Sequence, residues 1–219
     1  MRIIKVTGTG NIRLKPDLMR LYITLSGREK EYARALERSS ADTEKLRTLF
    51  DGLGFAREDL KTLSFTNDPA YEGYEDKHGN WRQKLVGYEF RHQLKLEFSF
   101  DNERLGKILK KLSAVGLTPE FSIGYAVKDT EAAKNELIAA AVADARKKAE
   151  ILAGAADLAL GEIQTIDYSI SRPEMEVVTM RKMTFGAAMD AAAEETFSPN
   201  IQPDDITAND TVTVTWEIR

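Results

Sequence analysis

The chain has 219 residues, of which 42% are hydrophobic and 30% are charged, and its formal net charge is −4. This composition is typical of a globular protein with a buried core. It excludes a largely disordered or membrane-embedded chain and any overall electrostatic attraction to nucleic acid. The absence of cysteine and the presence of only two histidines exclude disulfides, thiolate catalysis, zinc–sulfur sites and a histidine-rich metal centre.

The N-terminal part predicts two strands and a long helix. A first strand is expected over residues 3–10 and a second over residues 18–26, where apolar and polar residues alternate directly after Pro16. A helix is expected over residues 28–53, because apolar residues recur at helical spacing and Gly52 and Gly54 provide a stop. The predicted apolar stripe of this helix comprises Ala33, Leu36, Ser40, Leu46, Leu49, Phe50 and Leu53.

The middle of the chain predicts a loop between two strands. A short strand is expected over residues 60–66, followed by a loop over residues 67–80 that is rich in proline, glycine and asparagine. Residues 81–100 form the clearest strand pattern in the sequence, with apolar residues and His92 at the even positions.

The second half predicts two helices and three strands. Asp101 is expected to cap a helix that ends at Gly116, and residues 119–127 form a strand. A longer helix, capped by Asp129 or Thr130, runs to about residue 158 with an alanine-rich apolar stripe. Asp144 and Lys148 form an i, i+4 pair on its outer side. Strands are expected over residues 161–170 and 207–219.

These elements predict an α+β fold in the order β-β-α-β-β-α-β-α-β-β. Every strand has one apolar face, which favours a mainly antiparallel sheet with helices packed on one face. The order from residue 18 to residue 127 is a split βαβ arrangement. No linker-like segment divides the chain, so we expect a single domain over residues 1–219.

A methionine- and alanine-rich arm at about residues 172–203 does not fit the sheet. The segment is long for a connection inside a compact domain, and residues 186–195 are compatible with a short helix. Methionine-rich surfaces adapt readily to partners, so this arm either folds back on its own domain or packs against another subunit. The candidate oligomer contacts are Met175, Met180, Met183, Phe185 and Met189.

Catalytic and cofactor motifs are not found in the sequence. Gly8-x-Gly10 lacks the third glycine and the following helix of a nucleotide-binding loop, so both glycines are expected to serve backbone geometry at a strand end or bulge. His92 falls on the apolar face of its strand, where a core or boundary histidine is expected, and His78 falls in the loop. No serine lies in a nucleophile-elbow motif, and the paired acids are sequence neighbours that diverge in direction. We therefore expect no catalytic, cofactor-binding or metal-binding residue.

The 71–84 segment supports an alternative function. It mixes aromatic and basic residues, which is a combination that stacks on and neutralises single-stranded nucleic acid. An aromatic loop anchored to the domain, or a protein contact, explains the same residues. The candidate ligand residues are Tyr71, Tyr74, Trp81, Arg82 and Lys84.

Several motifs together resemble the SIMPL-domain family. The most specific are the Gly8-x-Gly10 pair, Lys15-Pro16-Asp17, and the 139–150 helix segment AAAVADARKKAE. They are joined by Leu53-Gly54-Phe55, by the 59–62 segment DLKT, by Pro69-x-Tyr71 and by the closing 211–214 strand TVTV. This family, which includes a bacterial periplasmic immunogenic protein, has no established function. The resemblance covers essentially the whole chain.

The resemblance implies an α+β fold, a tendency to form large homo-oligomers, no established enzymatic activity and no cofactor. It links the chain loosely to the cell envelope and to stress responses. The expected function is therefore a non-enzymatic, self-assembling structural or interaction domain, with ligand or single-stranded nucleic-acid binding as the alternative. The first residues, MRIIK, lack a secretory signal pattern, so we expect a cytoplasmic location, or a periplasmic or envelope location if the N-terminus was trimmed. No membrane span is expected.

Overall fold

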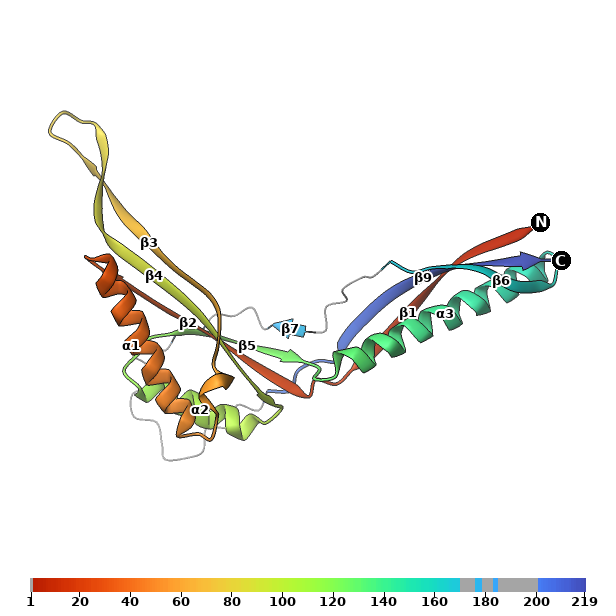
Figure 1. Cartoon of the computed structure of the whole chain (residues 1–219), viewed down its shortest axis with the longest axis horizontal. Coiled ribbons are helices and arrows are strands. Elements are labelled where there is room, and N and C mark those ends of the chain that lie inside the picture. Colours follow the sequence, from red (N-terminus) through yellow and green to blue (C-terminus); the bar gives the residue numbers. More distant parts are fainter. Residues whose placement is uncertain (1, 170–175, 179–182, 185–200) are drawn as a thin grey trace. The chain divides into compact units, whose positions relative to one another are not determined.

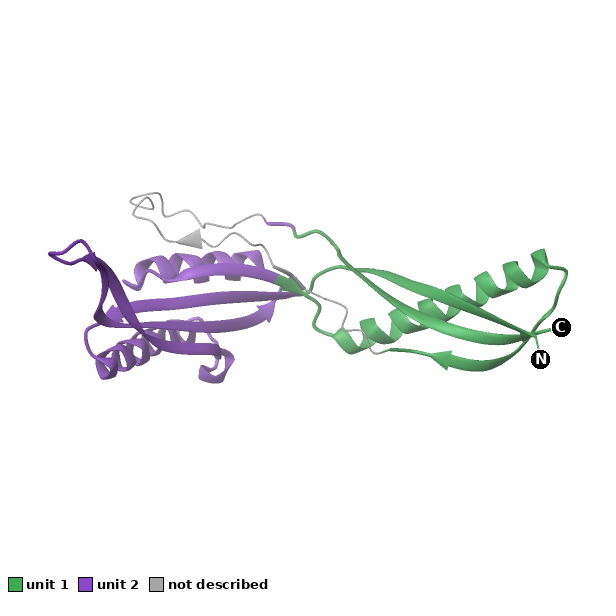
Figure 2. Ribbon diagram, turned by 90° about the horizontal axis from the view of Figure 1, so that it is seen from above, with its two compact units in different colours: residues 1–17, 125–177, 203–219 green, residues 18–124, 178–202 purple. Residues whose placement is uncertain are grey.

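The computed structural model describes residues 2–169, 176–178, 183–184 and 201–219, which form two compact units (Figure 2). Unit 1 comprises Met1–Asp17, Tyr125–Val177 and Pro203–Arg219, and unit 2 comprises Leu18–Gly124 and Val178–Gln202. The single domain expected over residues 1–219 would contain both units. Among the described residues, every helix is too short or too polar to cross a membrane.

Unit 1 is a three-stranded antiparallel sheet covered by one long helix (Figure 1). The strands lie in the order β1 (Ile3–Leu14), β9 (Ile206–Ile218) and β6 (Leu160–Asp167). Helix α3 (Thr130–Ala155) packs mainly on β1 and β9, and Asp129 caps it by accepting a hydrogen bond from the Ala132 N–H at 2.9 Å. Its buried residues recur every four positions and are mostly small: Ala133, Leu137, Ala141, Ala145, Ala149 and Ala153.

Gly8 and Gly10 lie inside β1, directly beneath the backbone of α3. A Cβ added to Gly8 would lie 2.1 Å from the Ala141 carbonyl oxygen, and one added to Gly10 would lie 2.1 Å from the Leu137 carbonyl oxygen. No side chain is compatible with such distances, so the two glycines allow the helix to rest on the strand. The prediction that they mark a strand end is wrong, because β1 continues to Leu14.

Side chains of α3 also cover the outer edge of β1. Asp144 accepts a hydrogen bond from the Thr9 backbone N–H at 2.7 Å and pairs with Lys148 at 2.7 Å. The Lys148 ammonium group, followed by the Thr9 N–H, holds the pKa of the Asp144 carboxyl below its ordinary value. The predicted Asp144–Lys148 pair is confirmed, and it satisfies a backbone group that an edge strand would otherwise leave unpaired.

Unit 2 is built on a larger antiparallel sheet. Its strands lie in the order β3-β4-β2-β5-β7, and β8 also pairs with β5. The central strand pairs are β2 (Leu18–Glu29) with β4 (Trp81–Ser99), and β4 with β3 (Lys61–Glu75). Because β4 lies between β2 and β3, the sheet has the split βαβ arrangement. The remaining strands are β5 (Glu120–Ala126), β7 (Glu176–Val178) and β8 (Met183–Thr184).

Helix α1 (Tyr32–Asp51) packs against this sheet and contacts a second helix, α2 (Asn102–Ala114). Helix α1 is followed by a short 3-10 turn, η1 (Arg57–Asp59), and helix α2 follows β4. The predicted Asp101 cap is confirmed, since its side chain accepts a hydrogen bond from the Arg104 N–H at 2.9 Å. The large buried side chains of the unit include Phe50, Leu94 and Leu105.

The α+β class and the mainly antiparallel pairing are confirmed, and two segments need correction. Helix α1 starts at Tyr32 rather than residue 28, because β2 continues to Glu29. The start of its predicted stripe is also wrong: Leu36 is exposed, and the buried residues are Ala35, Ser39, Thr43, Leu46 and Phe50. The predicted 67–80 loop is mostly strand, because residues 67–75 continue the pairing of β3 with β4.

The close approach of β1 to α3 is testable by substitution. We expect Gly8→Ala to lower the free energy of unfolding by more than about 2 kcal/mol, because the new methyl group would overlap the helix backbone. Gly154→Ala is the matched control, since Gly154 lies in α3 and a methyl group added there would have nothing within 4 Å. The control should raise stability by about 0.5–1 kcal/mol. Urea unfolding followed by circular dichroism measures both, and equal effects would contradict the proposed contact.

Candidate functional site

The β3–β4 hairpin closes with a tight, fully hydrogen-bonded tip. The Asp76 carboxylate accepts hydrogen bonds from the backbone N–H groups of His78 at 2.9 Å and Asn80 at 3.0 Å, and from Arg82 Nε at 2.7 Å. Gly79 adopts a φ of +81°, which favours glycine. The Arg82 guanidinium, followed by the two backbone donors, holds the pKa of Asp76 below its ordinary value. The tip is therefore a defined structure that positions the residues on either side of it.

Beyond the end of β2 the hairpin has only two strands. The pairing of β2 with β4 ends at Glu29 and Tyr88, whereas β3 and β4 stay paired to Glu75 and Trp81 (Figure 1). At about 3.4 Å per residue, the free part of the hairpin extends roughly 20 Å past the sheet. An isolated two-stranded hairpin is marginally stable in water, so this part needs support from elsewhere.

One face of the hairpin carries an apolar row. Odd-numbered residues of β3 from Phe65 to Glu75 share a face, because side chains alternate along a strand, and their partners on β4 lie on the same face. This is the face on which His92 meets α1. We define the hairpin stripe as Phe65, Pro69, Tyr71, Leu85 and Trp81.

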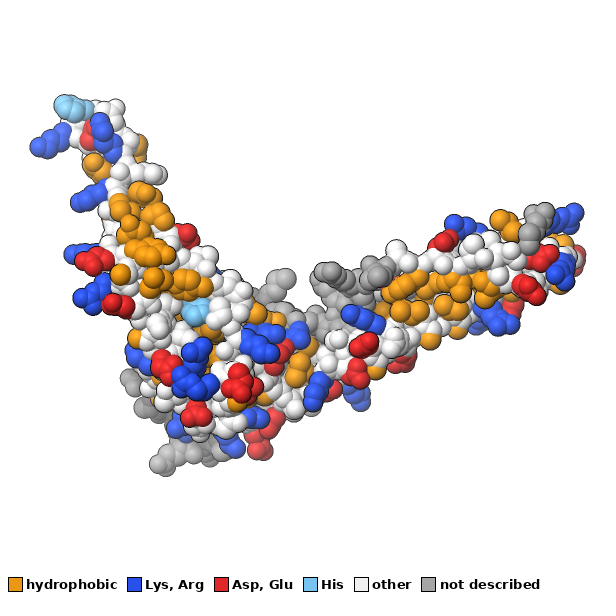
Figure 3. All heavy atoms as spheres, in the orientation of Figure 1, with side chains coloured by type: hydrophobic (Ala, Val, Ile, Leu, Met, Phe, Trp, Pro, Cys, Tyr) orange, Lys and Arg blue, Asp and Glu red, His pale blue; other side chains and the backbone are white. Residues whose placement is uncertain are grey.

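The hairpin stripe is open to solvent. Trp81 is 78% exposed, Tyr71 is 56% exposed, Leu85 is 44% exposed and Phe65 is 40% exposed. Figure 3 shows a run of hydrophobic side chains over the hairpin. Trp81 rests on Gly73, where an added Cβ would lie 3.0 Å from Trp81 Cζ3, so one side of the indole is supported and the other faces solvent. A contiguous exposed row of this kind marks an interaction site more often than an ordinary surface.

The structure separates the five predicted ligand residues between two faces. Tyr71 and Trp81 belong to the hairpin stripe, whereas Tyr74, Arg82 and Lys84 lie on the opposite face. Arg82 pairs with Asp76 at 2.7 Å, and Lys84 lies opposite Glu72 in the strand register. The bases therefore do not surround the exposed stripe aromatics.

Most of the predicted oligomer contacts lie outside the residues that the structure describes. Met175, Met180, Phe185 and Met189 lie outside the described residues, and Met183 is the first residue of β8.

The sequence patterns did not reveal Leu85 and Phe65 as surface residues. The signal for Phe65 was the odd-position periodicity of residues 65–75, which Pro69 and Gly73 obscure. The face of Leu85 follows from its pairing with Tyr71 after a register shift.

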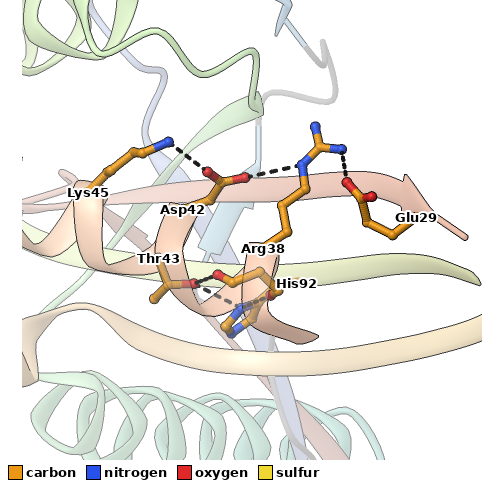
Figure 4. A network of polar contacts seen from close by, with 7 residues as sticks. Glu29, Arg38, Asp42, Thr43, Lys45 and His92 are labelled. Carbon is orange, nitrogen blue, oxygen red and sulfur yellow. Dashed lines mark hydrogen bonds and ion pairs between the residues drawn. The ribbon is translucent and has the colours of Figure 1, made fainter. Parts of the chain in front are cut away.

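A line of ion pairs runs along α1 (Figure 4). Arg38 Nη1 lies 2.9 Å from Glu29 Oε1 and Arg38 Nε lies 3.8 Å from Asp42 Oδ2, while Lys45 Nζ lies 3.1 Å from Asp42 Oδ1. These groups neutralise one another, and Arg38, Asp42 and Lys45 border a polar cleft of about 210 Å³. The ion pairs therefore stabilise the exposed face of α1.

His92 lies between α1 and the base of the hairpin. Its Nδ1 is 3.2 Å from Ser39 Oγ and 3.1 Å from Thr43 Oγ1, and its Nε2 is 2.9 Å from Thr62 Oγ1. Ser39 is buried, and Thr43 donates its hydroxyl proton to the Ser39 carbonyl at 2.8 Å. A buried serine beside a histidine whose hydrogen-bond partners are hydroxyl groups, and whose ring packs against Phe65, is suited to packing α1 on the sheet. Within the described residues, no cluster of three metal-ligating side chains occurs.

The position of His92 predicts a pH dependence of stability. Burial, followed by the nearby Arg47 guanidinium, lowers the pKa of His92 below its ordinary value of 6.5. The unfolded chain then binds more protons, so stability is complete above pH 6.5 and falls as the pH drops below it, with a slope of at most about 1.4 kcal/mol per pH unit. Urea unfolding between pH 8 and 5 measures this slope. His92→Gln should reduce it and His78→Gln should leave it unchanged, and a slope that survives His92→Gln would contradict the assignment.

Comparison with known proteins finds relatives that align with nearly the whole chain. The chain is 28% identical over 219 residues to the 26 kDa periplasmic immunogenic protein of Brucella melitensis, covering 99% of this chain and 84% of that protein. The 26 kDa periplasmic immunogenic protein of Brucella abortus matches with the same identity and coverage. Residues 4–216 match a family described as proteins of unknown function (DUF541), and the chain therefore belongs to the SIMPL family.

Proposed function

We propose that this protein is a non-enzymatic interaction domain that self-assembles through the hairpin stripe. The exposure of Trp81, Tyr71, Leu85 and Phe65 on one face of the hairpin carries this proposal. Their exposed side-chain area is on the order of 400–500 Å². A standard protein interface buries about 800 Å² on each partner, so the stripe supplies about half of one side.

The hairpin favours association through its face rather than its edge. The outer edge of β3 contains Pro69, which has no N–H to donate to a neighbouring strand. The register shift between Thr62 and Ser64, where Leu63 is an extra residue of β3, interrupts this edge further. Prolines and bulges are the usual devices that stop edge-to-edge pairing. The exposed face has no such protection.

The polar groups of the described residues support a structural role for unit 2. The ion pairs of Glu29, Arg38, Asp42 and Lys45 are mutually satisfied, and Ser39 beside His92 is shielded from solvent. The names of the two curated relatives place those proteins in the periplasm. We propose the same compartment for this chain and a role at the cell envelope.

Self-assembly through the hairpin stripe is testable by light scattering. Size-exclusion chromatography with light scattering should detect oligomers of the wild-type protein at micromolar concentration. The triple variant Tyr71→Ser, Trp81→Ser, Leu85→Ser should be monomeric with an unchanged circular dichroism spectrum, since these side chains are exposed. Tyr74→Ser is the matched control, because it removes an aromatic ring from the opposite face and should leave assembly intact. A monomeric wild-type protein, or an unaffected triple variant, would refute the proposal.

The alternative function, binding of a ligand or single-stranded nucleic acid, has one observation in its favour. The solvent-facing side of the Trp81 indole is a surface on which a base or another flat ring stacks. Quenching of Trp81 fluorescence by an oligonucleotide at low salt, with no oligomer in solution, would favour it over self-assembly.

A further inference from the structure

A shallow apolar groove lies between α1 and α2. It has a volume of about 700 Å³ and is lined by Ala41, Thr48 and Leu49 of α1 and by Lys111, Ala114 and Val115 at the end of α2. Binding sites for compact ring-containing ligands have volumes of this size. In Figure 1, α2, whose end lines the groove, lies at the end of unit 2 opposite the hairpin tip, so the hairpin tip of one copy is far from that copy's own α2.

The groove and the hairpin carry complementary charges. Lys111 borders the groove, and within the described part of the chain no ion-pair partner lies beside it. The other charged residues there are engaged, because Glu44 pairs with Arg57 and Lys45 pairs with Asp42.

Glu75 is the matching charge on the hairpin. It lies directly opposite Trp81 in the strand register and on the same face. In the described residues it too has no ion-pair partner. The exposed indole thus has an acid at its side, and the apolar groove has a base at its rim.

We propose that Trp81 of one copy docks in the α1–α2 groove of a second copy, where Glu75 pairs with Lys111. This inference rests on the self-assembly proposed above and specifies what the hairpin stripe binds. The roughly 20 Å of free hairpin provides the reach. Trp81 and the α1–α2 groove are different surfaces at opposite ends of one unit, so the contact between two copies is head-to-tail. A head-to-tail contact repeats from copy to copy and forms a ring or a filament.

Charge reversal tests the pairing of Glu75 with Lys111. We expect Glu75→Lys alone and Lys111→Glu alone each to raise the concentration needed for assembly roughly tenfold, because each places like charges together. The double variant should assemble at close to the wild-type concentration. Analytical ultracentrifugation measures all four proteins. A double variant as weak as either single variant would overturn the pairing.

Cross-linking tests the docking itself, since the chain has no native cysteine. Gln83 lies on the stripe face beside Trp81, and Ala114 lines the groove. A mixture of Gln83→Cys and Ala114→Cys proteins should form disulfide-linked dimers on mild oxidation. A mixture of Gln83→Cys with Lys107→Cys, which is exposed on α2 outside the groove, should not.

The outcomes separate this inference from the proposed function. A monomeric wild-type protein would refute both. Efficient cross-linking of Gln83→Cys to itself would mean that two stripes pack face to face, which preserves self-assembly and overturns groove docking. Assembly that depends on Trp81 but shows neither charge rescue nor the mixed cross-link would also overturn groove docking alone.

Discussion

The contact between the backbones of α3 and β1 is the constraint on which unit 1 depends. Gly8 and Gly10 have no side chains, and α3 presents Ala141 and Ala145 to them, so helix and strand come closer than any larger residues permit. This closeness brings Asp144 within hydrogen-bonding distance of the Thr9 N–H, which covers the edge of the sheet. A motif that resembles a phosphate loop in its spacing is therefore a packing motif.

Unit 1 is closely packed, whereas part of the sheet of unit 2 lacks a packing partner. The sheet of unit 2 is covered by α1, the pairing of β2 with β4 ends at Tyr88, and beyond that point the hairpin continues alone. The hydrogen bonds of Asp76 stabilise the tip, but they do nothing for the apolar face. The exposed Trp81 and Tyr71 are well suited to binding, because aromatic side chains have only two χ angles and lose little conformational entropy when they become buried.

The two units manage their sheet edges differently. In unit 1 the Asp144 side chain of α3 satisfies a backbone N–H at the edge of β1, and in unit 2 the edge of β3 is interrupted by Pro69 and by a bulge at Leu63. Both devices oppose uncontrolled strand pairing. In the assembly we propose, the exposed apolar face of the hairpin provides the specificity, because side chains rather than backbone determine what fits.

The sequence by itself determined the α+β class, the alternating apolar and polar residues of β4, and the cap at Asp101, because these follow from local periodicity and local hydrogen bonds. It left the cap of α3 open between Asp129 and Thr130, and the structure assigns it to Asp129. The sequence also singled out Tyr71 and Trp81 as surface aromatics. Only the tertiary structure decided that residues 67–75 form a strand, since pairing with β4 overrides the local turn preference of Pro69 and Gly73. Pairing also decided which side chains share a face: it placed Tyr71 and Trp81 together and Tyr74 and Arg82 opposite. The role of Gly8 and Gly10 likewise depends on α3, more than 120 residues away in the chain, and no local pattern encodes that distance.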